Sequence, residues 1–220
     1  MKDHTLPIVI IGSIVALIAF IIWLLWYLAK RRREAWMAAA DRLGFEYRRK
    51  DPGVLAEFGF FKLFQQGHSR KAYNILRGRI REGQVTLGDY RYTTGHGKHQ
   101  QVHVQSICVL RSKDIHLPHC FLRKQMRVFD FLGKLFGGQD INFDEDPEFS
   151  KAFVLQGADE LATRQAFHTE ARQWFLRYRG QPVQLECLND CILFHRGRTI
   201  KPELARELID EVTQIFHLWA

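Results

Sequence analysis

The feature that most constrains this chain of 220 residues is an uncharged apolar run near its N-terminus. From Leu6 to Ala29 no residue is charged, and most positions are Ile, Leu, Val, Ala, Phe or Trp. A helix rises about 1.5 Å per residue, so this run spans about 36 Å and exceeds the ~30 Å hydrocarbon core of a bilayer. The run predicts a transmembrane helix over residues 6–29, preceded by a short extracytoplasmic N-terminus at residues 1–5.

The end of the apolar run distinguishes a membrane anchor from a cleaved signal peptide. A signal peptide has a shorter apolar core, basic residues before it and small residues at its cleavage site. Here the run instead ends in bulky aromatic residues followed by a basic block: Trp23, Trp26, Tyr27, Lys30, Arg31, Arg32 and Arg33. Aromatic and basic side chains are favoured where a helix leaves the membrane. We therefore interpret the helix as an uncleaved anchor and predict that these seven residues lie at the membrane interface.

The basic residues around the run predict its orientation. Only Lys2 precedes the helix, whereas the four consecutive basic residues 30–33 follow it. The positive-inside rule places such a block in the cytoplasm. We expect an N-terminus outside, a basic juxtamembrane helix at residues 30–44, and a cytoplasmic domain at residues 45–220.

The cysteines agree with a reducing compartment, because their spacing shows no disulfide framework. The four are Cys108, Cys120, Cys187 and Cys191. The last two lie on opposite arms of an expected hairpin around Asn189 and Asp190. That turn pairs Cys187 with Ile192, so the two thiols are offset and are predicted to be packing residues.

Charge is unevenly distributed within a net charge of +8. Residues 41–135 contain 18 Lys and Arg against 8 Asp and Glu, whereas residues 136–220 contain 9 against 14. One interpretation is a cationic surface that faces anionic lipid headgroups. The other is that the two oppositely charged parts pack on each other. A nucleic-acid partner is disfavoured because the RNA-binding strand signature is absent.

Residues 45–124 show the alternation of strands after a helix that ends at Gly44. We expect a hairpin with Glu82-Gly83 as its turn, which pairs Ile80 with Val85. The expected strands of this antiparallel meander are residues 72–80, 84–92, 101–111 and 115–122.

The C-terminal half combines helices and strands. A short apolar helix is expected at residues 125–136, followed by an acidic loop at 140–148. The remaining expected elements are a strand at 153–156, a helix at 159–178 interrupted near His168, a hairpin at 183–188 and 191–196, and a last helix from Pro202. The predicted fold class is therefore α+β: an N-terminal transmembrane helix, an antiparallel meander and a β-α-β-β-α section.

Patterns that resemble ligand sites each lack a required residue. The segment 95–98, Gly-His-Gly-Lys, lacks the hydroxyl residue and the following helix of a phosphate loop. The loop that begins at Asp140 has Glu145 and Lys151 where an EF-hand needs Gly and Glu. Nor do the histidines follow a zinc-ligand spacing: His96, His99, His103, His116 and His119. We assign no catalytic, cofactor-binding or metal-binding residue.

A basic and apolar set of residues is the candidate lipid or partner surface. Its helical part, 125–136, suits either the headgroup plane or a core helix with cations at its rim. The candidate residues are Arg77, Arg79, Lys124, Arg127, Phe129 and Lys134.

The chain resembles an uncharacterised family of bacterial single-pass membrane proteins. The resemblance covers most of residues 43–217 and rests on five short motifs: Phe61-Lys62-Leu63-Phe64 with Gly67 and Arg70, Asn74 to Gly78, Asp89 to Gly95, Asp140 to Phe143 with Pro147 to Ser150, and Leu155-Gln156-Gly157. It implies a location in the bacterial inner membrane. It implies no activity, cofactor or catalytic residue.

Two functions follow from these observations. The leading hypothesis is a membrane-anchored interaction domain that binds a protein partner or the lipid surface. The alternative is a membrane-tethered enzyme whose site would draw on His68, Asp89, His103 and the carboxylates of residues 140–148.

Overall fold

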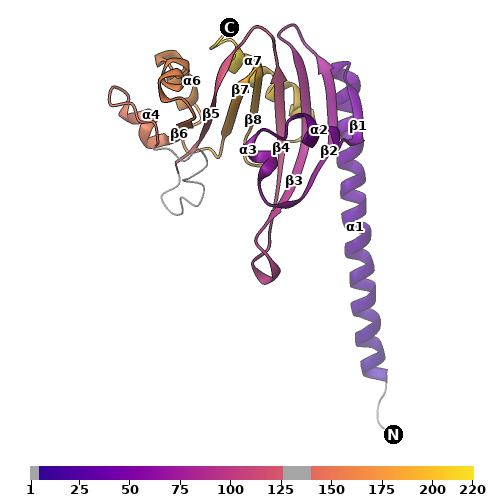
Figure 1. The fold of residues 1–220 in the computed structure, drawn as a ribbon. Coiled ribbons are helices and arrows are strands. Elements are labelled where there is room, and N and C mark those ends of the chain that lie inside the picture. Colours follow the sequence, from indigo (N-terminus) through magenta and orange to yellow (C-terminus); the bar gives the residue numbers. More distant parts are fainter. Residues whose placement is uncertain (1–4, 126–139) are drawn as a thin grey trace.

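The computed structural model describes residues 5–125 and 140–220 (Figure 1). All but the first residue of the helix expected at 125–136, including the candidate residues Arg127, Phe129 and Lys134, lies outside the described residues.

Helix α1 (Thr5–Leu43) is one continuous helix of 39 residues that joins the apolar run to the folded domain. In the described part of the chain it is the one helix long and apolar enough to cross a membrane. Its apolar stretch projects beyond the domain, and none of that stretch is buried (Figure 1). An apolar segment that no part of its own domain covers fits a membrane environment.

The end of α1 is as the sequence predicts. Gly44 adopts a positive φ of 68°. Its N–H bonds to the carbonyl of Asp41, and the N–H of Phe45 bonds to the carbonyl of Ala40. This pair of bonds is the Schellman arrangement, which satisfies the last carbonyls of a helix and needs a residue that tolerates a left-handed conformation.

The domain is built on one antiparallel sheet of eight strands in the order β1-β2-β3-β4-β8-β7-β5-β6. The strands are β1 (Glu46–Lys50), β2 (His68–Arg79), β3 (Gln84–Thr94), β4 (Gln101–Arg111), β5 (Leu117–Lys124), β6 (Phe153–Gly157), β7 (Gln184–Asn189) and β8 (Cys191–His195). The helices are α2 (Gly53–Glu57), α3 (Lys62–Gln65), α4 (Pro147–Ala152), α5 (Glu160–Ala166), α6 (Thr169–Leu176) and α7 (Ala205–Phe216), with short 3₁₀ turns η1 (Gly97–His99) and η2 (Pro202–Leu204).

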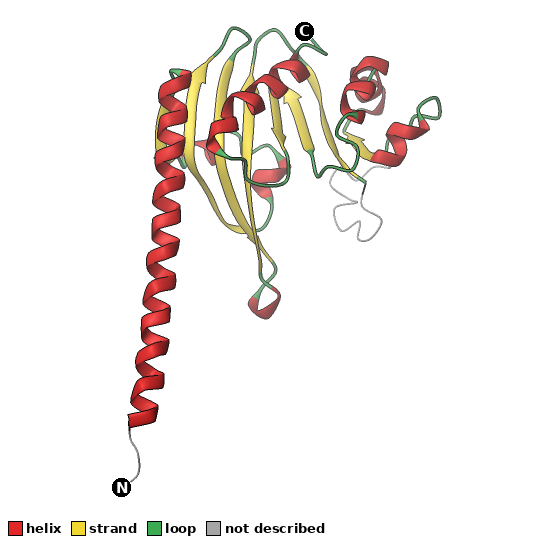
Figure 2. Ribbon diagram, turned by 180° about the vertical axis from the view of Figure 1, so that it is seen from behind, coloured by secondary structure: helices red, strands yellow, loops and turns green. Residues whose placement is uncertain are grey.

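Helices cover both faces of the sheet. The C-terminal part of α1 and the amphipathic α7 lie on one face (Figure 2), where Trp36 packs into the larger core. Helices α2 and α3 lie on the other face, where Phe58, Phe61 and Phe64 pack around Tyr90. Both cores continue onto the central strands β4 and β8, which therefore carry buried apolar side chains on each face.

The predicted α+β class is confirmed, as is the break between α5 and α6. The expected meander is wrong at its last strand, because β8 and β7 lie between β4 and β5. Residues of the β7–β8 hairpin such as Leu185, Ile192 and Phe194 are fully buried. Their apolar side chains place this hairpin in the centre of the sheet instead of at its edge.

The register of the first hairpin also differs from the expected one. The loop is Arg81-Glu82, because Ile80 and Gly83 exchange backbone hydrogen bonds. Gly78 therefore pairs with Val85 instead of Leu87. A shift of two residues keeps every side chain on its expected face, so the alternation pattern alone does not distinguish the two registers.

The cysteines lie in the core, and all four are buried free thiols. As expected from the turn, Cys187 pairs with Ile192 and Leu188 with Cys191. Cys187 also lies opposite Cys120 on β5.

Candidate functional site

A buried ion pair joins α1 to the sheet at the last turns of the helix. Arg32 donates from Nε and Nη2 to the two carboxylate oxygens of Asp89 on β3, at 2.9 and 2.7 Å. The Asp89 side chain is fully buried, whereas Arg32 keeps about a third of its surface in contact with solvent. The two residues are 57 positions apart, and their bidentate geometry fixes the level of the helix against the strand.

Three more side chains donate to the same carboxylate. They are the Trp36 indole at 3.0 Å, the Asn74 amide at 3.1 Å and the Ser106 hydroxyl at 2.7 Å. Burying a carboxylate is costly unless charge and hydrogen bonds compensate for its lost hydration. With five donated bonds Asp89 is well compensated, so its role is structural: it gathers α1, β2 and β4 around one point.

Asn74 reaches Asp89 because strand β2 bulges there. The residue has a φ of +51°, and the β2–β3 register shifts between Tyr73 and Leu76. Opposite the bulge is Gly88, where a Cβ atom would lie 2.6 Å from the Asn74 carbonyl oxygen. The glycine allows the close approach that turns the Asn74 side chain towards the carboxylate.

The same cluster also forms hydrogen bonds with the segment before α7. Arg32 Nη1 donates to the Ile200 carbonyl at 3.0 Å, and the Ile200 N–H donates to Ser106 Oγ at 3.1 Å. The C-terminal helix and the apolar helix are thus held to the same part of the sheet.

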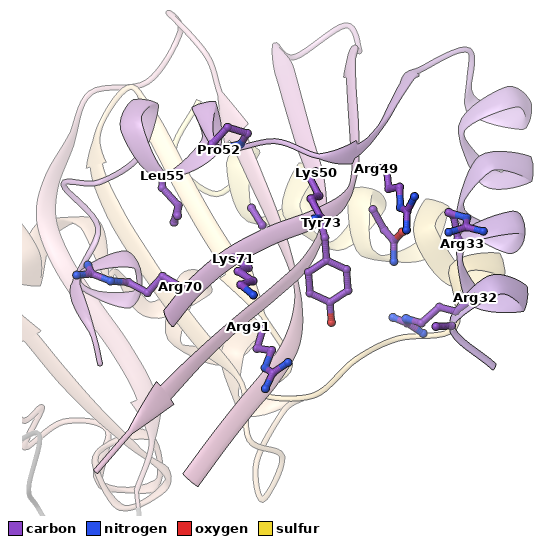
Figure 3. Close-up of a pocket in the computed structure, with 13 residues that line it drawn as sticks. Arg32, Arg33, Arg49, Lys50, Pro52, Leu55, Arg70, Lys71, Tyr73 and Arg91 are labelled. Atoms are coloured by element: carbon purple, nitrogen blue, oxygen red, sulfur yellow. The ribbon is translucent and has the colours of Figure 1, made fainter. Parts of the chain in front are cut away.

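Beside this cluster a cleft of about 640 Å³ opens between α1, β1 and the start of β2 (Figure 3). Seven of its thirteen lining residues are basic and none is acidic. The basic residues are Arg32, Arg33, Arg49, Lys50, Arg70, Lys71 and Arg91. The remaining wall is formed by Ala29, Pro52, Leu55, Ala72, Tyr73 and Asn74.

Most of these cations are not neutralised by the protein. Arg32 is paired with Asp89, and Arg70 donates to the Phe64 carbonyl at 2.6 Å. The other five form no ion pair with any described residue: Arg33, Arg49, Lys50, Lys71 and Arg91. Lys71 and Arg91 are moreover directly opposite each other on β2 and β3. Like charges held together without a counter-ion favour binding of an anion.

The cleft also contains a neutral hydrogen-bond donor and an apolar wall. Burial raises the pKa of Tyr73 above its ordinary value, and the nearby Asp89 charge adds to this effect, so the phenol stays protonated. Leu55 and Ala29 contribute apolar surface to the same lining. The arrangement suits a ligand that carries a negative charge next to apolar groups.

The predicted interface residues divide between the cleft and the exposed surface of α1. Arg32 and Arg33 line the cleft. The other five lie on the exposed part of the helix, where Lys30 stands over the Trp26 ring at 5.6 Å and Arg31 over the Tyr27 ring at 5.9 Å. Trp23 stacks on Tyr27.

The other described candidates for a lipid or partner surface lie outside the cleft. Arg77 is bound to Asp51 at 2.7 Å and to Glu57 at 2.8 Å on the face that carries α2, so its charge is neutralised. Arg79 is exposed near the β2–β3 turn. Lys124 donates to the Gly180 carbonyl at 2.5 Å at the far end of the sheet.

The residues considered for an enzyme do not converge. Asp89 is fully engaged, His68 binds the Gly95 carbonyl at 3.2 Å, and His103 binds the Thr94 hydroxyl at 2.8 Å. The acidic loop lies beside β6 at the opposite end of the sheet, where Asp146 caps α4. Within the described residues no group of three or more His, Cys, Asp or Glu could hold a metal ion.

Sequence reasoning did not assign five of the seven basic residues of the cleft to a site: Arg49, Lys50, Arg70, Lys71 and Arg91. They come from β1, β2 and β3 and meet only through strand pairing. One sequence signal was available, because the stretch from Tyr90 to Arg111 contains basic residues and no Asp or Glu.

Comparison with known proteins shows the fold and no family. No protein-family model matches the chain, and no curated protein matches it. Among solved structures the chain is similar to the crystal structure of the mycobacterial trehalose monomycolate transport factor A, TtfA. The TM-score is 0.50 at 14% sequence identity, and the match covers 86% of this chain and 95% of that one. The class thus defined is an α+β domain that follows one N-terminal apolar helix.

Proposed function

We propose that this chain is a single-pass membrane protein whose domain binds an anionic lipid headgroup in the cationic cleft beside α1. The observation that carries the proposal is the position of the cleft. Its wall includes Ala29, the last residue of the apolar run, together with Arg32 and Arg33 from the basic block that follows it. A headgroup in the membrane that α1 spans would lie at the level of this wall without leaving the bilayer.

The basic residues also support the orientation. A block of cations directly after the apolar run favours a cytoplasmic domain, and the cytoplasmic leaflet carries the anionic lipids. Each basic residue close to such a surface contributes about 1 kcal/mol. With five unpaired cations in the cleft, charge alone gives a preference for anionic over zwitterionic lipid.

A protein partner is the second candidate, favoured by the edge of β2. Strand β1 covers β2 only from Tyr73 onwards, so His68 to Lys71 could pair with a partner's strand. Ser69, however, has a φ of +54°, and the pairing register shifts here. Irregular edges of this kind hinder strand addition. This makes lipid the better-supported ligand. The name of the structural neighbour refers to transport of trehalose monomycolate, but at 14% identity it supports the shared fold alone.

Lipid titration of the full-length protein tests the proposal. In mild detergent, native mass spectrometry should show phosphatidylglycerol binding in preference to phosphatidylcholine. The double substitution Lys71→Gln/Arg91→Gln should weaken phosphatidylglycerol binding at least tenfold, at about 1 kcal/mol per charge. Lys113→Gln is the matched control, because Lys113 is exposed in the β4–β5 loop. Equal affinity for both lipids, or equal binding by both variants, would contradict the proposal.

A further inference from the structure

The β3–β4 hairpin extends beyond the rest of the sheet on the side of the apolar helix. Strands β3 and β4 pair without interruption from Gln84–Arg111 to Thr94–Gln101. Beyond His68, which pairs with Thr93, no described strand other than β4 lies beside β3. In both ribbon views the tip points in the same direction as the N-terminal part of α1 (Figures 1 and 2).

The Arg32–Asp89 pair sets the level of this tip along the helix. From Asp89 to Thr94, where β3 ends, the strand advances five residues, which is about 16 Å at 3.3 Å per residue. At 1.5 Å per residue the same length of α1 is about 11 residues, from Arg32 back to Ile21. An inclination of about 45° between strand and helix would reduce the length to about 12 Å, which still reaches the level of Leu24.

That level lies inside the apolar run. The run spans about 36 Å, about 6 Å more than the hydrocarbon core, so its last residues extend into the headgroup layer even without tilt. A hairpin whose strands end between the levels of Ile21 and Leu24 cannot remain in bulk water if α1 crosses the membrane. It must contact lipid.

The side chains of the hairpin suit such contact. Val102 and Val104 lie on the same side of β4 and are 52% and 37% exposed. The tip carries Lys98 together with His96 and His99, all exposed. Exposed aliphatic groups next to a lysine, without an acidic residue, are typical of protein segments that lie in the headgroup layer.

The hairpin is also held in a defined position. The His68 ring binds the Gly95 carbonyl at 3.2 Å and lies 5.4 Å from the His96 ring. At its base Tyr92 stacks on His103, with ring centroids 4.7 Å apart. The tip is therefore presented to its surroundings as an ordered element.

We propose that the tip of the β3–β4 hairpin, residues 94–101, is a second membrane contact that inserts into the headgroup layer beside α1. Together with α1 it would hold the sheet at one angle to the bilayer, with the cationic cleft between the two contacts. The inference rests on the part of the proposed function that places α1 across a membrane. It does not depend on which ligand occupies the cleft.

A single thiol label tests the proposal, because the four native cysteines are buried. Lys98→Cys and the control Lys113→Cys each receive an environment-sensitive fluorophore, and full-length protein is reconstituted into phosphatidylcholine vesicles. Lys113 is exposed in the loop at the opposite end of β4. The label at position 98 should emit at shorter wavelength and should be quenched several-fold more by headgroup-nitroxide lipid than the label at 113. Equal emission and quenching at both positions would overturn the proposal.

The lipid composition separates this test from that of the cleft. In pure phosphatidylcholine the cleft has no anionic ligand, yet the tip should already be quenched because α1 holds it there. If the label at 98 stays in water while phosphatidylglycerol still binds through Lys71 and Arg91, the hairpin proposal alone is wrong. As a second variant, Val102→Ser/Val104→Ser should reduce the quenching at 98, because it removes the exposed aliphatic side chains next to the tip. Exposed positions can change without loss of the fold.

Discussion

Arg32, in the basic block that follows the apolar run, forms a bidentate ion pair with Asp89, a fully buried carboxylate 57 residues further along the chain. Helix α1 and the sheet are thus parts of one rigid unit. A flexible linker would let the domain move freely beneath its anchor. Here the direction of α1 is fixed relative to the sheet, so under the proposed function it determines how the cleft and the hairpin would face the bilayer.

The first prediction concerns this pair. Arg32→Ala leaves a buried carboxylate without its charged partner and should lower the free energy of unfolding by about 3 kcal/mol. Arg31→Ala is the control, because Arg31 contacts the Tyr27 ring and no part of the sheet. Chemical denaturation in detergent micelles measures both. Equal midpoints for the two variants would show that the pair does not hold helix and domain together.

The second prediction concerns the bulge that brings Asn74 to Asp89. In Gly88→Ala the new methyl group would lie 2.6 Å from both the Asn74 carbonyl oxygen and the Ile75 Cδ1 atom. The bulge must shift, and we expect a loss of about 2 kcal/mol, within the range for overpacked sites. Gly97→Ala is a matched control for space, because nothing lies within 4 Å of its added Cβ, although its φ of +57° adds a backbone cost of about 1 kcal/mol. A loss for Gly88→Ala no larger than that of the control would contradict this account.

The third prediction is a pH dependence that arises from His195. Burial lowers the pKa of this imidazole to about 3, from an ordinary value of 6.5. The folded protein keeps the ring neutral, whereas the unfolded chain gains a proton below pH 6.5. The resulting stability is present above pH 6.5 and is lost as the pH falls from there towards 3.

Between pH 7 and pH 5 this loss amounts to about 2 kcal/mol. In the parent protein the Gly197 N–H donates to His195 Nδ1 at 3.1 Å. His195→Asn retains an acceptor for this N–H. The variant should therefore lose about 2 kcal/mol less than the parent protein over the same interval. Urea denaturation at the two pH values measures the difference, and identical pH dependence would rule out His195 as its source.

The elements of the fold could be predicted from the sequence where the signal is local. The apolar run, the end of α1 at Gly44 and the break near His168 depend on residues close together in the chain. The order of the strands could not be predicted in the same way. The position of β7 and β8 between β4 and β5 depends on which hairpin buries more apolar surface within the whole sheet.

The candidate site was predictable only in part. Arg32 and Arg33 were recognised as interface residues, because they lie in the basic block directly after the apolar run. Lys71 and Arg91 come together through strand pairing, which in turn depends on a bulge at Asn74 that alternation does not reveal. The five donor atoms around Asp89 come from three separate segments, α1, β2 and β4, so they could be found only in the three-dimensional structure.

The central claim, that the cleft holds an anionic lipid, is tested most directly by photo-crosslinking from inside it. A benzophenone amino acid replaces Tyr73, which lines the cleft, and the full-length protein is irradiated in its native membrane. The same amino acid at Lys113, in the exposed β4–β5 loop, is the control. Mass spectrometry should identify an anionic phospholipid attached at position 73 and none at position 113. A protein adduct at position 73, or the same lipid yield at both positions, would contradict the account.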